Sequence, residues 1–182
     1  MLSYDHAMSN SPASQESIGL ALGCFWGAQK LLDSLDGVSE TTVGYMGGDA
    51  SHPSYRQVCS GSTGHAETVW VTYDPEQIDV ADILKVFLEN HDPTQGDRQG
   101  NDVGSQYRSV VFPTTTEQAA TARQLIADYE PRLAEAGYGP ITTTVEEPGA
   151  HEYWLAEEEH QHYLKKNPFG YCPVHATGVT CG

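Results

Sequence analysis

The residues Ile18-Gly19-Leu20-Ala21-Leu22-Gly23-Cys24-Phe25-Trp26-Gly27 join a predicted strand to a predicted helix. Residues 18–22 form a short apolar run bounded by turn-prone residues, which predicts the strand. Residues 25–35 carry apolar side chains at helical spacing, which predicts the helix. Cys24 therefore lies where the strand passes into the helix.

This position of Cys24 bears on its reactivity. Unpaired backbone N–H groups and the helix dipole favour negative charge at a helix N-terminus. They are expected to lower the pKa of the thiol and so to favour the reactive thiolate. Phe25 and Trp26 follow, flanked by two glycines, which suggests a nucleophile beside an apolar wall. The alternative is an inert cysteine in an aromatic core, because free cysteine is often fully buried.

The composition indicates one globular domain with a sizeable core, since the chain has 182 residues, of which 38% are hydrophobic. No apolar run approaches the ~20 residues needed to span a bilayer. Residues 1–16 are polar without the pattern of a signal peptide, so we expect a disordered leader and a cytoplasmic protein. The net charge of −16 argues against nucleic acid and anionic membranes as partners. The simplest explanation of this acidic charge is that it keeps the protein soluble, rather than that it binds a basic partner.

The four cysteines, Cys24, Cys59, Cys172 and Cys181, include no CxxC pair. A zinc ribbon and a thioredoxin-type motif are therefore excluded. In a reducing cytosol, cysteines spread in this way are catalytic or inert. Cys172 and Cys181 have eight residues between them, a loop that can close into a disulfide, and a mobile tail can also bring one of them to Cys24. We interpret Cys59 as structural or spare.

Strands and helices follow one another without strict alternation. We expect further strands at residues 38–45, 65–73, 107–112 and 141–145, and helices at 79–91, 116–136 and 156–166. The polar loops 50–64 and 92–104 are long for a compact domain, which is typical of functional loops. This order predicts an α/β two-layer sandwich, with residues 17–166 as the catalytic domain and 167–182 as a flexible coil tail.

Four polar side chains are candidates for chemistry. Glu67 lies in an apolar strand; if it faces inward, desolvation raises its pKa and keeps it protonated, and if it faces solvent it is an ordinary strand residue. Asp102 lies in a loop that either covers a pocket or simply contains an aspartate because aspartate is common in turns. Tyr55 and Tyr107 either hydrogen-bond an oxyanion or simply pack.

The run from Glu157 to His162 raises the question of a metal site. His160 and His162 are two residues apart and would point away from each other on a helix. The HExxH spacing is absent, so we expect no metal.

Several blocks resemble the A-type peptide-methionine sulfoxide reductases, which reverse methionine oxidation. The signature is Gly-Cys-Phe-Trp-Gly at 23–27. The other blocks follow in the family's order: GYMGG at 44–48, YRQVCSG at 55–61, GHAE at 64–67, YDP at 73–75, NHDPTQ at 90–95, RQGNDVGSQYRS at 98–109, HQHYL at 160–164 and Asn167-Pro168. The resemblance implies a ferredoxin-like α+β core with a mixed sheet.

The resemblance also implies roles in the reduction of methionine S-sulfoxide, free or in proteins, as repair of oxidised proteins. Cys24 would be the nucleophile and Glu67 the acid that protonates the sulfoxide oxygen. The other implied roles are a methyl seat from Phe25 and Trp26, oxygen binding by Tyr55 and Tyr107, positioning by Asp102, and a resolving thiol at Cys172. Thioredoxin would reduce the oxidised enzyme. The resemblance also implies a monomer and a reaction that needs no metal or organic cofactor.

Three departures from the family pattern stand beside this resemblance. Gln29 lies where many relatives have glutamate, and residues 173–180 hold one glycine where relatives are often glycine-rich. The chain ends one residue after Cys181, in the region of a second recycling cysteine, so the role of Cys181 stays open. Two other functions also stay open: a different thiol enzyme, such as a peroxidase or disulfide reductase, and a non-catalytic acidic binding module.

Overall fold

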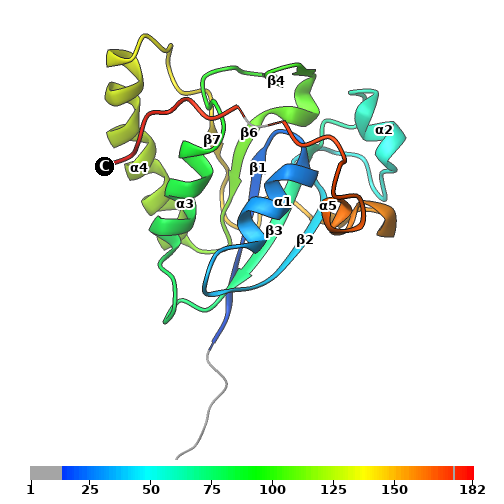
Figure 1. The fold of residues 1–182 in the computed structure, drawn as a ribbon. Coiled ribbons are helices and arrows are strands. Elements are labelled where there is room, and N and C mark those ends of the chain that lie inside the picture. The colour runs from blue at the N-terminus through cyan, green and yellow to red at the C-terminus, as the bar shows by residue number, and fades with distance from the viewer. Residues whose placement is uncertain (1–13, 174) are drawn as a thin grey trace, which may run out of the picture.

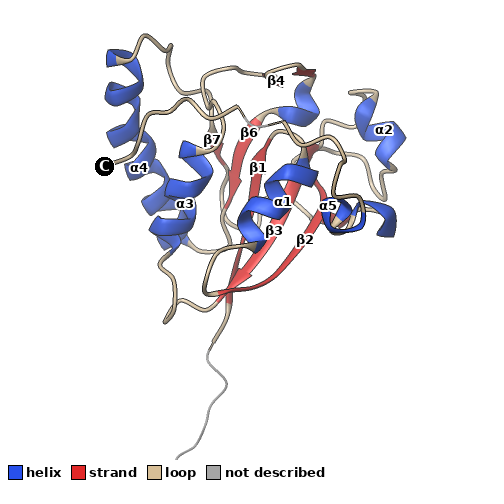
Figure 2. Cartoon of the chain, in the orientation of Figure 1, coloured by secondary structure: helices blue, strands red, loops and turns tan. Residues whose placement is uncertain are grey.

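The structure, a computed structural model, describes residues 14–173 and 175–182. Its main sheet has six strands in the order β7-β6-β1-β3-β2-β8 (Figure 2). The four central strands, β1 (Glu16–Leu22), β2 (Val38–Met46), β3 (Ala66–Tyr73) and β6 (Ser109–Phe112), pair antiparallel. At the edges, β7 (Thr144–Val145) is parallel to β6 and β8 (Trp154–Leu155) is antiparallel to β2. The mixed sheet confirms the predicted fold class. Most of the leader expected at residues 1–16 lies outside the described residues.

Three helices, α1 (Phe25–Asp33), α3 (Val80–Glu89) and α4 (Thr116–Glu135), lie on one face of the sheet (Figure 1). The main core forms between them and the sheet, with fully buried side chains such as Leu20, Leu32, Val71, Phe87 and Leu133. The opposite face carries a smaller cluster that includes Met46 and Phe112, covered in part by Tyr153. No helix of the described residues is long and apolar enough to cross a membrane.

The best-patterned elements form where the sequence predicts them. Asp79 caps α3 by accepting the backbone N–H of Ala81 at 3.1 Å. Thr115 caps α4 in the same way, and α4 continues through Pro131 without a break.

Both loops predicted as polar and irregular contain short elements. Residues 50–64 include α2 (Tyr55–Cys59), which begins with a capping box between Ser54 and Gln57. The Ser-x-x-Gln spacing is the signal that the loop interpretation overlooked. Residues 92–104 include the strands β4 (Arg98–Gln99) and β5 (Asp102–Val103), which pair with each other.

The single helix predicted at residues 156–166 is wrong. The chain there forms a 3₁₀ turn at 158–160 and the short helix α5 (Tyr163–Lys166). Gln161 accepts the N–H of Val43 at 3.0 Å and donates to its carbonyl at 2.8 Å, so this side chain pairs with β2 as a strand would. His162 then adopts a left-handed conformation with φ of 51°, which interrupts any continuous helix.

Candidate active site

The sheet topology brings three chain segments together at one end of the sheet. The strand β1 ends just before Cys24, and its antiparallel neighbour β3 begins just before Glu67. The other neighbour of β1 is β6, which begins just after Tyr107. Antiparallel neighbours place the end of one strand beside the start of the next. Residues far apart in sequence therefore meet at the N-terminus of α1.

The first backbone N–H groups of α1 are directed at the candidate side chains. The N–H of Phe25 donates to Glu67 Oε1 at 3.1 Å. The backbone N–H groups of Trp26 and Gly27 lower the pKa of Cys24, which immediately precedes the helix, but its side chain does not cap α1 by a hydrogen bond. The first N–H groups of a helix have no partner within the helix, and here one of them binds the candidate acid.

The expectation that the pKa of Cys24 is lowered is wrong. The pKa of its thiol is raised to about 12, chiefly by burial and then by the nearby Glu67, with a smaller contribution from Asp102, while the backbone N–H groups of Trp26 and Gly27 oppose the shift. The helix N-terminus therefore acts as expected, but desolvation outweighs it. Cys24 is a thiol at neutral pH in the unliganded protein, and it remains partly exposed, unlike the inert core cysteine of the alternative.

Glu67 faces the core rather than solvent. It shares its side of β3 with Val69, Val71 and Tyr73, and it is 2% exposed. Its Oε2 has no hydrogen-bond partner among the described residues. Burial raises the pKa of Glu67 to about 8, the Phe25 N–H opposes the shift, and Asp102 adds to it. The carboxyl is thus protonated at neutral pH, as the inward-facing interpretation expects.

An aromatic wall stands beside these two groups. The Tyr55 ring lies 4.3 Å from the ring of His160 and stacks on Phe25 and Trp26 at 6.4 and 6.5 Å between centroids. Trp26 also stacks on Tyr163 at 4.0 Å. The seat proposed for a methyl group therefore has rigid, packed walls.

The two candidate phenols are close to the same acid. Burial, and then the charge of Glu67, raise the pKa of Tyr55 and of Tyr107, so both hydroxyls keep their protons and can donate. Asp102 Oδ1 accepts the hydroxyl of Tyr171 at 3.3 Å, and its Oδ2 is buried without a partner among the described residues. Asp102 thus lies at the site rather than in a remote turn.

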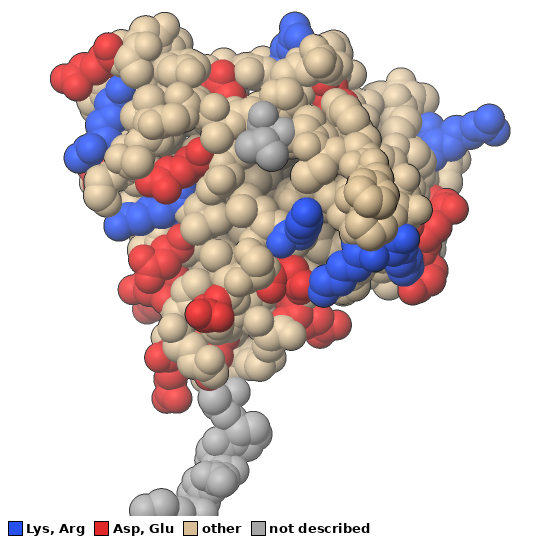
Figure 3. Space-filling model, in the orientation of Figure 1, with Lys and Arg blue, Asp and Glu red and all other residues tan. Residues whose placement is uncertain are grey.

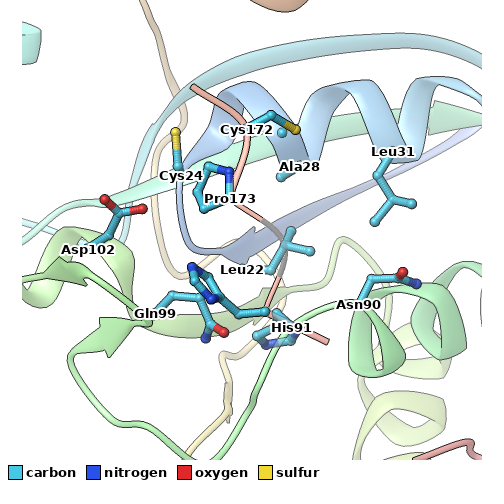
Figure 4. A pocket seen from close by; sticks show the side chains of 12 residues that line it. Leu22, Cys24, Ala28, Leu31, Asn90, His91, Gln99, Asp102, Cys172 and Pro173 are labelled. Carbon is cyan, nitrogen blue, oxygen red and sulfur yellow. The ribbon is translucent and has the colours of Figure 1, made fainter. Parts of the chain in front are cut away.

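A cavity of about 80 Å³ borders Cys24 (Figure 4), and Phe25, Trp26 and Tyr55 are not part of its lining. Its lining includes Cys24, Asp102, Cys172 and Pro173, and Figure 4 shows Pro173 between the two cysteines in that view. A Cβ built on Gly27 would lie 3.4 Å from the Cys172 sulfur, so Cys172 rests against the first turn of α1. Cys24 and Cys172 therefore face one common space.

Cys181 lies elsewhere. Its backbone N–H donates to Glu89 at the end of α3 at 2.7 Å, and the Tyr129 hydroxyl of α4 donates to the Val179 carbonyl at 2.8 Å. Figure 1 shows the tail running from the site across α3 to α4. Burial, followed by Glu89, raises the pKa of the Cys181 thiol to about 11. The structure does not bring Cys181 to the common cavity.

The sequence interpretation missed the role of His160. Its Nδ1 accepts the indole N–H of Trp26 at 3.1 Å, which leaves the proton of the neutral ring on Nε2. Ligand atoms of Glu157, Glu159 and His160 lie within 4.8 Å of one another, a spacing that a metal ion can bridge. A protonated Nε2 cannot ligate, however, so this arrangement does not fit a cation.

Two further placements complete the site. Cys59, interpreted as structural or spare, is at the end of α2 and close to Tyr55 and Glu67. Gln29 is buried, donates to the Thr41 carbonyl and accepts the His162 N–H at 2.8 Å, so it supports the wall without facing the cavity.

On the visible face, few acidic side chains lie over the start of α1. Figure 3 shows Asp and Glu gathered on the lower part of the visible face, whereas the region over the start of α1 is mostly uncharged. The high net charge therefore does not identify the substrate.

Comparisons with known proteins indicate one family. The family described as peptide methionine sulfoxide reductase matches residues 16–180. The chain is 54% identical over 170 residues to the peptide methionine sulfoxide reductase MsrA of Corynebacterium kroppenstedtii, covering 92% of this chain and 77% of that protein.

Solved structures are similar as well. Methionine sulfoxide reductase A of Corynebacterium diphtheriae matches with a TM-score of 0.84 and 47% identity, covering 95% of this chain and 84% of that one. Mxr1 from Saccharomyces cerevisiae in reduced form matches with a TM-score of 0.80 and 35% identity, covering 90% and 92%. Mxr1 in complex with Trx2 matches at 0.56 and 23% identity, covering 96% and 93%, which supports the fold alone.

Proposed function

Since this chain belongs to the peptide methionine sulfoxide reductase family, we propose that it reduces methionine S-sulfoxide, free or in proteins, with Cys24 as the nucleophile. The observation that carries this proposal is the pairing of Cys24 with a buried, protonated Glu67 at the start of α1. A sulfoxide needs both a nucleophile at sulfur and a proton donor at oxygen.

The first step transfers oxidation from the substrate to Cys24. The Cys24 sulfur attacks the sulfoxide sulfur while Glu67 gives its proton to the oxygen, which Tyr55 and Tyr107 hold by hydrogen bonds. The thiol proton of Cys24 returns to Glu67. Methionine leaves reduced by two electrons, and Cys24 is oxidised by two electrons to a sulfenic acid. The methyl group rests on Phe25 and Trp26, and Asp102 positions the polar network.

The second step resolves the sulfenic acid. The Cys172 thiol condenses with Cys24, which forms a disulfide and releases water. The cavity that both cysteines border supports this pairing, because the thiol can approach without unfolding of α1.

Recycling of the disulfide requires an external dithiol, and we propose thioredoxin. Cys172 is exposed, which suits attack by another protein. A role for Cys181 requires its tail to leave Glu89 and Tyr129, after which its thiol can displace Cys24 from Cys172. We also propose that the protein is cytoplasmic, since this chemistry consumes thiols that a reducing compartment keeps reduced. We further propose that it is a monomer with residues 17–166 as its catalytic domain.

Replacement of the nucleophile tests the proposal. Cys24→Ser should abolish methionine formation from methionine sulfoxide with a chemical dithiol as reductant. Normal turnover of that variant would contradict the assignment.

Substrate competition separates the alternative functions. A reductase of the proposed kind loses thiols when methionine sulfoxide is added, whereas a non-catalytic binding module loses none. A thiol peroxidase would consume peroxide in preference to a methyl sulfoxide.

A further inference from the structure

We propose that Glu157 is a positioning residue that fixes Tyr55 for oxygen binding. The inference rests on the proposed role of Tyr55 in the reaction. Glu157 lies in the segment between β8 and α5, 102 positions from Tyr55 in the chain, and it touches neither Cys24 nor Glu67 through any described hydrogen bond.

Both carboxylate oxygens of Glu157 have a defined partner. Oε1 accepts the hydroxyl of Tyr45 at 2.9 Å, and Tyr45 is fully buried on β2. Oε2 accepts the backbone N–H of Tyr55 at 3.0 Å. Burial favours a raised pKa for Glu157, but the Tyr55 N–H and the Tyr45 hydroxyl lower it overall, so the group is a carboxylate. Glu157 therefore ties the first residue of α2 to a rigid strand.

The helix α2, which carries Tyr55, depends on contacts from outside its own segment. With five residues, α2 is far too short to be stable by itself, and the Ser54–Gln57 capping box acts only within the segment. Its buried side chain is Val58, at the opposite end from Tyr55 in the turn. A carboxylate that accepts an N–H at a helix start is a charge-assisted hydrogen bond.

One turn of chain holds Tyr55 at two points. Glu157 binds its backbone, while His160, three residues later, packs its ring at 4.3 Å. His160 in turn accepts the Trp26 indole N–H. The same segment therefore sets the phenol and the apolar wall relative to Cys24, so loss of Glu157 would displace the Tyr55 hydroxyl in particular.

Three substitutions separate geometry from charge. Glu157→Ala removes both hydrogen bonds and should lower kcat about tenfold or more, because misplacement of a reacting group by ~1 Å costs up to ~100-fold. Glu157→Gln should keep most of the activity, since its amide oxygen accepts the Tyr55 N–H and its NH₂ donates to the Tyr45 oxygen. Glu158→Ala is the matched control. Glu158 is an exposed neighbour of Glu157, and its one ion pair among the described residues is with Lys166.

A double-mutant cycle with Tyr55→Phe distinguishes positioning from general damage. The cycle measures kcat and KM for methionine sulfoxide with a chemical dithiol, so that tail recycling does not limit the rate. We expect Glu157→Ala to lower kcat more than it raises KM in the wild-type background and to change kcat less than twofold in the Tyr55→Phe background. A structural defect would instead lower kcat equally in both backgrounds.

Each outcome has a separate meaning. If Tyr55→Phe alone retains full kcat, the proposed role of Tyr55 fails, and the positioning role of Glu157 fails with it. Suppose that Tyr55→Phe lowers kcat. If Glu157→Ala then leaves kcat unchanged, or if the effects of the two substitutions on kcat are additive, the Glu157 inference is overturned while the proposed function stands. Should Glu157→Ala not fold, Tyr45→Phe, which removes the partner of Oε1 and keeps the core ring, should still give a smaller loss of kcat that disappears in the Tyr55→Phe background.

Discussion

Cys24 and Glu67 both keep their protons at neutral pH for the same physical reason. Burial raises the pKa of the thiol to about 12 and that of the carboxyl to about 8. Neither group is therefore prepared to react alone, since the thiol is not yet a thiolate. In the proposed reaction a bound sulfoxide changes this balance, because its oxygen would accept the Glu67 proton while the thiol proton returns to the carboxylate. The resting thiol is also protected from unproductive oxidation, which needs the thiolate.

Glu67→Gln should slow the chemical step at least ~100-fold, as expected when a general acid is lost. Because the protonated carboxyl is the active form, kcat/KM of the wild type should fall as pH rises through about 8. The variant should lack this fall. The measurement is a pH–rate profile with methionine sulfoxide, and an unchanged rate would return Glu67 to a structural role.

Glu67 also couples stability to pH. Its pKa is raised from 4.5 to about 8 in the folded protein, so its contribution to stability is fully present below pH 4.5 and is lost as pH rises through about 8. The wild type should lose stability relative to Glu67→Gln by roughly 1.4 kcal/mol per pH unit in that window. Urea unfolding at pH 5 and pH 8.5 measures the difference, and a difference independent of pH would contradict the burial argument.

At the scale of elements, the tail is held by α3 and α4 in a position that keeps Cys181 from the cavity. Tyr129→Phe removes the hydrogen bond to the Val179 carbonyl and should speed formation of a Cys172–Cys181 disulfide about fivefold, the equivalent of one ordinary hydrogen bond. Time-resolved disulfide mapping by mass spectrometry measures this rate. Glu135→Gln, on the same helix, is the control.

An unchanged rate in Tyr129→Phe would mean that the docked tail does not limit recycling. If no Cys172–Cys181 disulfide forms in any variant, the proposed role of Cys181 falls, and Cys172 then exchanges directly with the external dithiol.

The elements that the sequence predicted well have a strong local signal. The helix α3 presents one apolar face to the core, so periodicity located it, whereas β3 was located by its run of β-branched and aromatic residues. The segment 156–166 was misread because its early acids and late lysines fit a helix dipole, whereas Gln161 pairs with Val43 of β2. A contact between residues 118 positions apart has no local signal.

The site was predictable in part for similar reasons. The position of Cys24 between strand and helix follows from local pattern, whereas the pattern of the strand left open which side Glu67 faces. The pKa of Cys24 was not predictable, because desolvation depends on segments such as 102–107 that fold over the thiol. The placement of Cys172 beside the cavity came from family resemblance, since coil residues carry no periodicity.

At the scale of the whole molecule, the candidate residues lie together at one end of the sheet. The ends of three neighbouring antiparallel strands place Cys24, Glu67 and Tyr107 there, and the C-terminal segment passes over this end with Cys172. The helices α3 and α4 lie beside it and hold the remaining thiol at a distance. Cys24 and Cys172 therefore lie together at the site, while Cys181 lies apart from it.

Cys172→Ser tests the proposed role of Cys172 as the resolving thiol. The variant should release about one methionine per enzyme and then stall with thioredoxin as reductant, because the sulfenic acid on Cys24 has no resolving thiol. Methionine quantified against enzyme concentration gives the stoichiometry. Steady thioredoxin-driven turnover would exclude Cys172 from the cycle.

The most direct measurement is mass spectrometry of the protein after a single turnover. Enzyme with Ser at positions 172 and 181 is mixed with one equivalent of methionine S-sulfoxide and digested after trapping of sulfenic acid. We predict one methionine released per enzyme, with a trapped sulfenic acid on the peptide that contains Cys24 and on no other. Methionine released without oxidation of Cys24, or with oxidation confined to Cys59, would contradict the account.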